Sequence, residues 1–421
     1  MDERFSRLRG FLDIFGEDLT YFELIESVFR KYSVLYGFNE LKTPILERTE
    51  LFVRGIGEGS DIVRKEMFSF EDRGGRSVTL RPEGTASVVR ALLENNLINE
   101  PRFQKVFYVG PMFRAERPQA GRLRQFHQVG VEWFGVDDPI IDVEVVSLVF
   151  DILFELGLVE RSELVINSVG CDVCSPNYKR ELEIFFDTHY NEFCDDCKQR
   201  REKNILRVFD CKNEKCQTLL KEATKITSSI CDVCRFHLDT LERYVSRLGI
   251  RYRIDESLVR GLDYYTRNVF EVRYQGIGSQ NAIAGGGRYN GLVSEFGGPN
   301  VPAFGFAMGI ERTMLALKEV RKPNYSKTVA VCTISGNEVE YAFKVVKILR
   351  SNGLISNLLS YLGSISKQFK FANRLGAKLV VVIGENEVKE NKVSIKDMDT
   401  GEQTSVSLDG LVNYIITNIS S

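Results

Sequence analysis

The sequence predicts an α+β protein in which an antiparallel sheet carries a helical insertion and a separate α/β domain follows. Three observations predict this fold class. Two β-rich segments flank a basic loop between residues 108 and 134, residues 171–252 are charged and rich in cysteine, and strand and helix patterns alternate over residues 328–421. β-rich runs joined by a polar loop indicate an antiparallel hairpin, whereas regular alternation indicates a small α/β domain.

Composition limits the class of protein. A chain of 421 residues with 43% hydrophobic content is expected to form two or three globular domains. The formal net charge is −2, so any surface that binds nucleic acid must be a local basic patch. Because no apolar run approaches membrane-spanning length and the start of the chain lacks a signal pattern, we expect a cytoplasmic protein without membrane contact.

The N-terminal part predicts a helix followed by an edge strand. Thr20 and Glu23 match a capping box, apolar residues then recur at helical spacing, and Gly37 is a stop signal, so we expect a helix over about residues 20–36. Residues 38–47 are β-like but contain a proline, which is typical of an edge strand or a strand start.

Residues 67–71 and 76–80 flank an Asp-Arg-Gly-Gly turn and predict a hairpin. Glu83 and Thr85 then stand where a turn enters an apolar helix. They either cap the helix, or Glu83 receives a ligand ammonium group, and the local sequence alone favours the cap. Residues 141–157 predict a strongly apolar core helix.

Further along the chain, β character returns around residues 258–265, and glycine-rich segments follow at 282–289 and 304–312. Residues 319–327 read as a polar linker. The tail is expected to contain strands at 329–334 and 379–383, a helix around 342–349 that stops at Gly353, and a closing helix at 410–419.

The predicted hairpin of residues 108–134 has an unusual polar face. Side chains alternate between the two faces of a strand, so two sets share one surface: Met112, Arg114 and Glu116, and Phe126, Gln128, Gly130, Glu132 and Phe134. Buried charges cost several kcal/mol, roughly, without partners. A binding floor explains the set, with arginine for phosphate, phenylalanine for stacking and acids for amines. The alternative is a solvated outer face.

The familiar nucleotide-binding loops are absent from the sequence, and only His127, His189 and His237 are available for histidine-based acid–base catalysis. Instead, arginines recur beside glycines, among them Arg260 and Arg312. On an antiparallel sheet without a glycine loop, polyphosphate must be neutralised by side chains, and arginine forks suit that task. Any one of these arginines alone reads equally as a surface or ion-pair residue.

Eight of the nine cysteines lie close together in the predicted insertion, and the ninth, Cys332, reads as a core residue. Their spacing predicts two structural Zn²⁺ sites, one in each sequential half. The first half would use Cys171, Cys174, Cys194 and Cys197, and the second Cys211, Cys216, Cys231 and Cys234. Unligated thiols and disulfides are the competing interpretations.

Five segments, in this order, resemble the motifs of the class II aminoacyl-tRNA synthetases, specifically the histidyl-tRNA synthetase family. They are Arg81-Pro82-Glu83-Gly84-Thr85, Phe113 to Gln128 (motif 2), Arg260-Gly261-Leu262-Asp263-Tyr264-Tyr265, Gly285-Gly286-Gly287-Arg288-Tyr289, and Gly309-Ile310-Glu311-Arg312 (motif 3). The resemblance covers nearly the whole chain. Departures are Ala115, Leu123 and Asn290, of which Leu123 puts one polar substrate contact in doubt.

The resemblance implies a class II catalytic domain over residues 1–320, interrupted by the insertion at 171–252, and a C-terminal anticodon-binding domain over 328–421. It implies a homodimer that joins L-histidine to tRNA(His) through a histidyl-adenylate, using ATP with Mg²⁺. It also implies the following roles: catalysis by Arg114 and Arg260; histidine binding by Glu83, Thr85, Gln128, Glu132, Tyr264, Tyr265, Gly285 and Tyr289; ATP binding by Arg114, Glu116, Arg124, Phe126 and Arg312.

Two other functions stay open at this point. A non-catalytic paralogue of the fold regulates ATP phosphoribosyltransferase in histidine biosynthesis, and such a protein could lose the phosphate-binding arginines and the C-terminal domain. A synthetase for a different amino acid is the third possibility. The tyrosine pair at 264–265 and Glu132 argue against it.

Overall fold

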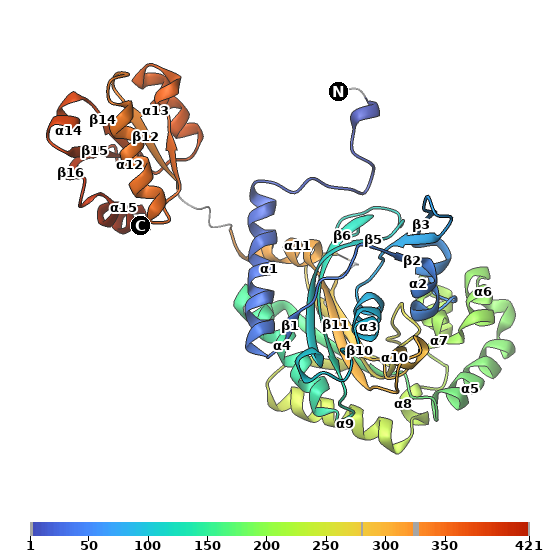
Figure 1. Cartoon of the computed structure of the whole chain (residues 1–421). Helices are drawn as coiled ribbons and strands as arrows, with labels where there is room; N and C mark the ends of the chain where they lie inside the picture. Colours follow the sequence, from blue (N-terminus) through green and yellow to red (C-terminus); the bar gives the residue numbers. More distant parts are fainter. Residues whose placement is uncertain (1–2, 279–280, 323–327, 420–421) are drawn as a thin grey trace. The chain divides into compact units, whose positions relative to one another are not determined.

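The computed structural model describes residues 3–278, 281–322 and 328–419 (Figure 1). The chain forms two compact units, Met1–Pro323 and Asn324–Ser421. Residues 323–327 of the predicted linker lie outside the described residues, and helix α11 (Ile310–Val320) occupies the first positions of that linker. Within the described parts, no helix combines the length and hydropathy that a membrane crossing needs.

An eight-stranded sheet forms the centre of the first unit. Its interior is antiparallel, and parallel pairs stand at its two edges. In spatial order the strands are β1 (Asn39–Glu40), β5 (Lys105–Phe113), β6 (Gln125–Phe134), β11 (Ala303–Gly309), β10 (Ala282–Arg288), β9 (Thr266–Tyr274), β7 (Ser162–Ser168) and β8 (Tyr252–Ile254). The β5–β6 pair is the long hairpin that the sequence predicts.

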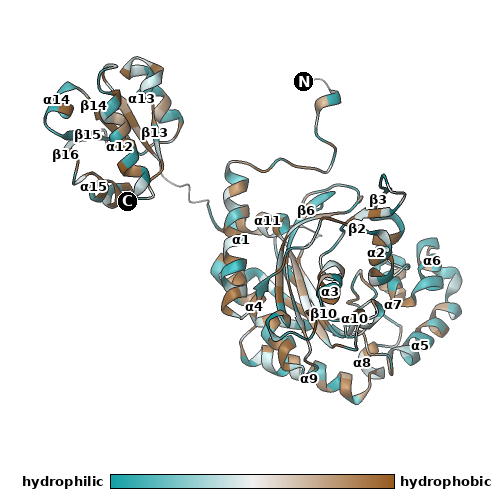
Figure 2. Cartoon of the chain, in the orientation of Figure 1, coloured by the Kyte–Doolittle hydropathy of each residue, from teal (hydrophilic) through white to brown (hydrophobic). Residues whose placement is uncertain are grey.

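Alternate residues of this sheet enter two different cores, as strand geometry requires. Phe107 and Val131 pack with the helices on one face, which are α1 (Glu17–Leu35), α4 (Ile140–Leu156), α9 (Asp232–Arg247) and α11. Val106 and Tyr108 pack on the other face with α3 (Thr85–Glu94) and α10 (Leu292–Glu295). Figure 2 shows apolar residues gathered on the strands and along one side of these helices. The helices on this second face leave part of the sheet free for the site.

A second, three-stranded sheet lies beside the first and contains the predicted hairpin of residues 67–80. Its strand order is β2 (Leu46–Arg48), β4 (Ser77–Leu80) and β3 (Phe68–Glu71), and α2 (Thr49–Ile56) follows β2. The predicted capping box at the start of α1 is wrong. The helix begins at Glu17 after Gly16, and the Thr20 hydroxyl donates to the Gly16 carbonyl instead.

The insertion leaves the sheet after β7 and returns at β8. Its first helices are α5 (Ser175–Thr188), α6 (Asp195–Lys203), α7 (Glu214–Leu220) and α8 (Ile226–Ser229), which share a small core of their own. We call residues 175–230 the insertion lobe. Figure 1 shows α5, α6 and α7 as a helical group at the edge of the unit. The last helix, α9, packs in the main core instead.

The segment 258–265 is not a strand, contrary to the β character expected there. It is a loop that enters β9, and its backbone makes bonds outside any ladder, such as that from Asp263 N to Ile56 O at 3.0 Å. We call residues 258–265 the signature loop.

The second unit is a five-stranded sheet with helices. Its strand order is β13 (Ser356–Leu358), β12 (Val329–Thr333), β14 (Leu379–Ile383), β15 (Lys392–Asp397) and β16 (Gln403–Ser407). Its helices are α12 (Val339–Ser351), α13 (Ile365–Arg374), α14 (Glu385–Lys389) and α15 (Leu411–Ile419). The strands and helices expected in the tail are therefore present, and Cys332 is a buried core residue.

Candidate active site

A cavity of about 650 Å³ opens on the free face of the large sheet. The motif 2 hairpin, the start of α3, the signature loop, β10 and α11 contribute to its lining, and so does the insertion lobe. With one exception, the residues predicted for catalysis, histidine binding and ATP binding line it together: Glu83, Thr85, Arg114, Glu116, Phe126, Gln128, Glu132, Arg260, Tyr264, Tyr265, Gly285, Tyr289 and Arg312.

The exception is Arg124, which lies outside the described lining of the cavity. Its Nε donates to the Glu116 carbonyl at 3.2 Å and its Nη1 to the Arg9 carbonyl at 3.4 Å. Arg122, two residues earlier in the same loop, lines the cavity in its place and pairs with the Glu116 carboxylate at 2.8 Å. Sequence reasoning missed Arg122 because the family resemblance gave the ATP-binding role to Arg124, and the composition of the basic loop does not show which of its arginines faces the cavity.

A buried carboxyl group lies at the floor of the cavity. Glu132 on β6 is 1% exposed, and it accepts hydrogen bonds from the Thr85 hydroxyl, at 2.7 Å, and from the Tyr289 hydroxyl. Burial raises the pKa of Glu132 to about 8. On the neighbouring strand, a Cβ atom at Gly305 would lie 1.9 Å from Glu132 Oε2. Only glycine at that position leaves room for the carboxyl group.

Glu83 caps helix α3 and also lines the cavity. Its carboxylate accepts from the backbone N–H groups of Thr85 at 2.6 Å and Ala86 at 2.8 Å. The helix cap favoured by the local sequence is therefore present. Burial raises the pKa of Glu83, while the two backbone bonds oppose that shift. The same carboxylate remains available to an ammonium group entering from the cavity.

Aromatic rings and an unused amide complete this end of the cavity. The ring centroids of Tyr264 and Tyr265 lie 4.7 Å apart, and Tyr264 packs edge-on against Tyr289 at 5.6 Å. Gln128 Oε1 is buried and has no hydrogen-bond partner within the described residues. A buried acceptor without a partner costs about 1–3 kcal/mol, so this oxygen marks a place where a ligand donor belongs.

Arginines surround the other end of the cavity. Arg114 Nε donates to the Pro82 carbonyl at 3.0 Å, and its guanidinium lies 5.2 Å from the centroid of the Phe126 ring. Arg312, near the start of α11, donates to the carbonyls of Gly121 and Ala282, both at 2.9 Å. These backbone contacts hold both side chains in place without neutralising their charge.

The electrostatics of this end favour an anion. Burial lowers the pKa of Arg312, and the positive charges of Arg122, Arg114 and Arg260 lower it further. Arg260 pairs with Glu271, and a Cβ atom at Gly285 would lie only 2.6 Å from Arg260 Nη2. Glycine at 285 thus lets this arginine lie flat against β10. Bound phosphate would relieve the mutual repulsion of the guanidinium groups.

A family model described as "Histidyl-tRNA synthetase" matches residues 10–313. The chain belongs to the histidyl-tRNA synthetase family. A second family model, described as "Anticodon binding domain", matches residues 328–418 of this synthetase. The fold is accordingly that of a class II synthetase with a catalytic domain and a C-terminal anticodon-binding domain.

Known relatives extend the likeness of this synthetase over its full length. A histidine–tRNA ligase of Halothermothrix orenii is 49% identical, over 96% of this chain and 97% of the relative. One from Thermotoga maritima is 46% identical, over 99% of each. The crystal structure of apo S. aureus histidyl-tRNA synthetase matches with a TM-score of 0.80 and 37% identity, covering 97% of this chain and 99% of that one.

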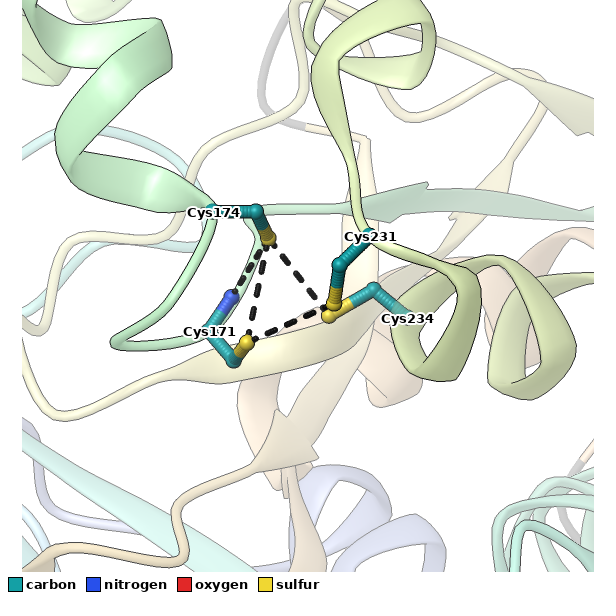
Figure 3. A group of neighbouring side chains, drawn as sticks. All are labelled: Cys171, Cys174, Cys231 and Cys234. Atoms are coloured by element: carbon teal, nitrogen blue, oxygen red, sulfur yellow. Dashed lines mark hydrogen bonds between the residues drawn. The ribbon is translucent and has the colours of Figure 1, made fainter.

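The eight clustered cysteines of this synthetase form two groups of four, but not the sequential halves that the spacing predicted. The groups are nested: the outer cluster is Cys171, Cys174, Cys231 and Cys234, and the inner cluster is Cys194, Cys197, Cys211 and Cys216. In each group the sulfur atoms lie within 4.8 Å of one another. The outer cluster closes the two ends of the insertion lobe, as Figure 3 shows, and the inner cluster lies inside the lobe.

The sulfur distances exclude disulfides between these cysteine pairs. Sγ atoms lie 3.8 Å apart for Cys171–Cys174, 3.7 Å for Cys171–Cys231 and 3.6 Å for Cys194–Cys211. A disulfide requires about 2.05 Å. Metal–sulfur bonds of about 2.3 Å in a tetrahedron place the sulfurs about 3.8 Å apart. The thiols of both clusters are free, and these distances fit a tetrahedral metal ion.

Proposed function

We propose that this synthetase activates L-histidine with ATP and transfers the histidyl group to tRNA(His), acting as a cytoplasmic homodimer. One observation carries the proposal. The buried Glu132 carboxyl, which accepts from the hydroxyls of Thr85 and Tyr289, lies at one end of the cavity. The other end of the same cavity is lined by an aromatic ring and four arginines: Phe126, Arg114, Arg122, Arg260 and Arg312. One end suits a small polar ring and the other a nucleotide.

At the histidine end, Glu132 accepts from the imidazole N–H, and Tyr264 and Tyr265 enclose the ring. Glu83 receives the α-ammonium group beside the N-terminus of α3. Gln128 Oε1, which lacks a partner among the described residues, accepts a further donor of the amino acid. Thr85 and Tyr289 orient the Glu132 carboxyl, and Gly285 leaves the substrate close access to β10.

At the ATP end, Phe126 stacks on adenine and Glu116 accepts from its amino group. A histidine carboxylate oxygen attacks the α-phosphorus, the bond to the β-phosphate oxygen breaks, and pyrophosphate leaves. Arg114 and Arg260 stabilise the charge that develops on the α-phosphate, while Arg312 holds the γ-phosphate. Catalysis thus rests on alignment and electrostatics rather than on a nucleophilic side chain.

The second step uses the same cavity. A terminal ribose hydroxyl of the tRNA attacks the activated carbonyl, and AMP leaves. In the proposed organisation, residues 1–320 form the catalytic domain, interrupted by the insertion at 171–252, and residues 328–421 bind the anticodon.

The residues present fit the Mg²⁺ that class II synthetases use with ATP. Burial and the neighbouring Glu116 both raise the pKa of Glu66, which lines the cavity, and a divalent cation would relieve that repulsion. Glu66 and the β- and γ-phosphate oxygens would hold the ion, since Mg²⁺ prefers one or two carboxylates, phosphates and water. Its chemistry there is to neutralise charge on the departing pyrophosphate.

Each cysteine cluster is proposed to hold one structural Zn²⁺, because four thiols at tetrahedral separation are typical of such sites. Metal analysis of the purified protein should give about two equivalents of zinc, one for each cluster. A zinc content below about half an equivalent would contradict the proposed zinc sites.

Histidine-dependent exchange of pyrophosphate into ATP tests the main proposal. We expect exchange with histidine and none above background with the other amino acids. Absence of exchange would favour the regulatory paralogue, and exchange with another amino acid would favour a synthetase of different specificity. The arginines in the cavity and the presence of the C-terminal unit both support the catalytic function over the regulator.

A further inference from the structure

The insertion lobe reaches the signature loop through a buried arginine. Arg207 lies on the short 3₁₀ helix η6 (Ile205–Asp210) and is 7% exposed. Its Nη2 and Nε both donate to Asp263 Oδ1, at 2.7 and 3.1 Å, and its Nη1 donates to the Arg260 carbonyl at 2.8 Å. Asn204 Nδ2 donates to the same Asp263 oxygen at 2.9 Å. The lobe therefore holds both ends of the segment Arg260–Asp263.

The other side of Asp263 is also fixed. Its backbone N–H donates to the Ile56 carbonyl at the end of α2, and a Cβ atom at Gly57 would lie 2.5 Å from Asp263 Oδ2. Asp263 is thus held between α2 and the lobe. The loop lacks ladder bonds over residues 258–265, so these contacts take the place of a sheet in setting its position. Arg260, Tyr264 and Tyr265 on the same loop line the cavity.

Two cysteines of the inner cluster flank η6 in the chain. Cys197 on α6 precedes η6, and Cys211 directly follows it, with its N–H donating to the Val208 carbonyl at 3.2 Å. Cys197, Cys211 and Cys216 are themselves members of the small lobe core. A core of this size gains little from apolar burial, and a metal that joins four thiolates would supply the missing constraint.

We infer that a metal ion in the inner cluster orders η6, and that Arg207 transmits this order through Asp263 to the histidine-binding loop. Arg207 is thus a positioning residue for histidine activation, and the metal content of the lobe sets the affinity for the amino acid. This inference rests on the proposed function, because it concerns the same cavity. It assigns to the lobe a role in the histidine site that the motif residues alone do not supply.

The first experiment compares Arg207→Ala with Arg201→Ala in histidine-dependent pyrophosphate exchange. Arg201 belongs to the same lobe but pairs with Asp187 at the lobe surface. Arg207→Ala should raise the KM for histidine about tenfold or more, since a buried charged hydrogen-bond network is lost. The KM for ATP should change less than about twofold, and Arg201→Ala should leave both constants within about twofold of the parent. Arg207→Lys should recover only part of the loss, because one ammonium cannot bond Asp263 and the Arg260 carbonyl in the fork geometry.

The second experiment removes one ligand of the inner cluster. Cys211→Ser should lower bound zinc from about two equivalents to about one and raise the KM for histidine as Arg207→Ala does. In the double variant the two effects should not add, since both act through one contact. If Cys211→Ser fails to fold, stepwise chelation of the parent protein followed by return of Zn²⁺ alone replaces it, with the histidine KM rising on removal and recovering on return.

The outcomes separate the two proposals. Absence of histidine-dependent exchange in the parent protein would overturn the proposed function. Normal exchange in the parent, with an unchanged histidine KM in Arg207→Ala or an equal rise in both KM values, would overturn the positioning role. Loss of zinc without any change in the histidine KM would overturn the coupling to the metal.

Discussion

The catalytic sheet and the insertion lobe face the same cavity but fix their side chains by different means. In the sheet, register places Glu132 opposite Gly305, and apolar cores on both faces hold the strands. In the lobe, short helices share a small core of which Cys197, Cys211 and Cys216 are members. The comparison teaches that backbone pairing preorganises the sheet side of the site, whereas the lobe side combines a small core with thiols at metal-binding distance.

Metal removal should give the largest difference between the two regions, measured as the loss of amide protection. Chelation at neutral pH should abolish amide protection across residues 175–230 while strands β5, β6 and β11 keep theirs, because both cysteine clusters lie in the lobe or at its two ends. Hydrogen exchange measured with and without chelator checks this. Equal loss of protection in the sheet, or full protection of a metal-free lobe, would break the comparison.

Arg260→Ala tests whether an arginine of the signature loop, which the lobe contacts through Arg207, carries the chemistry. Loss of one donor to the developing phosphate charge should lower the activation rate by about two or more decades while the fold stays intact. Single-turnover adenylate formation measures this rate. Arg76→Ala is the matched control, since it removes an exposed arginine that pairs with Asp72 in the turn between β3 and β4. A rate within about twofold of the parent in the Arg260 variant would refute the assigned role.

Glu132→Gln should weaken histidine binding by about one to two decades and leave ATP binding nearly unchanged. Thr85 and Tyr289 donate to different carboxyl oxygens, so the amide can accept from only one of them, and it cannot ionise when an imidazole N–H approaches. Calorimetric titration with each ligand separates the two affinities, and Glu163→Gln at the surface serves as control. Equal losses for histidine and ATP would argue against contact between Glu132 and the ring.

The pH dependence of stability gives a further test of the buried Glu132 carboxyl. Burial raises the pKa of Glu132 from 4.5 to about 8, so the folded protein prefers the protonated acid. Its contribution to stability is therefore complete below about pH 4.5 and is lost as pH rises through about 8. Relative to Glu132→Gln, the free energy of unfolding of the parent should fall by a few kcal/mol, roughly, over that interval. Parallel pH profiles of the two proteins would contradict this.

The sequence predicts those elements of the fold whose patterns lie within short segments, and it fails where distant residues set the structure. The β5–β6 hairpin and the α/β tail were predictable because alternation and helical spacing are properties of short segments. The capping box at Thr20 was wrong because Gly16 begins the helix earlier. The signature loop has a β-like composition, but its hydrogen bonds go to α2 and the lobe, which lie far away in the chain. Local sequence could not show these partners, so the segment was mistaken for a strand.

The site shows the same division. The arginines and acids in matched motifs reach one cavity, whereas Arg124 points to backbone carbonyls and Arg122 replaces it there. Thiol spacing identified eight candidate ligands but could not distinguish sequential from nested clusters, since both use the same Cys-x-x-Cys units. Arg207 carried no motif, and only the folded lobe brings it to Asp263.

The most direct test of the central claim is a crystal structure of the protein soaked with histidine and ATP. The account predicts the imidazole ring against Glu132 between Tyr264 and Tyr265, with the α-phosphate between Arg114 and Arg260. An imidazole bound away from Glu132, or a nucleotide whose phosphates avoid both arginines, would contradict it.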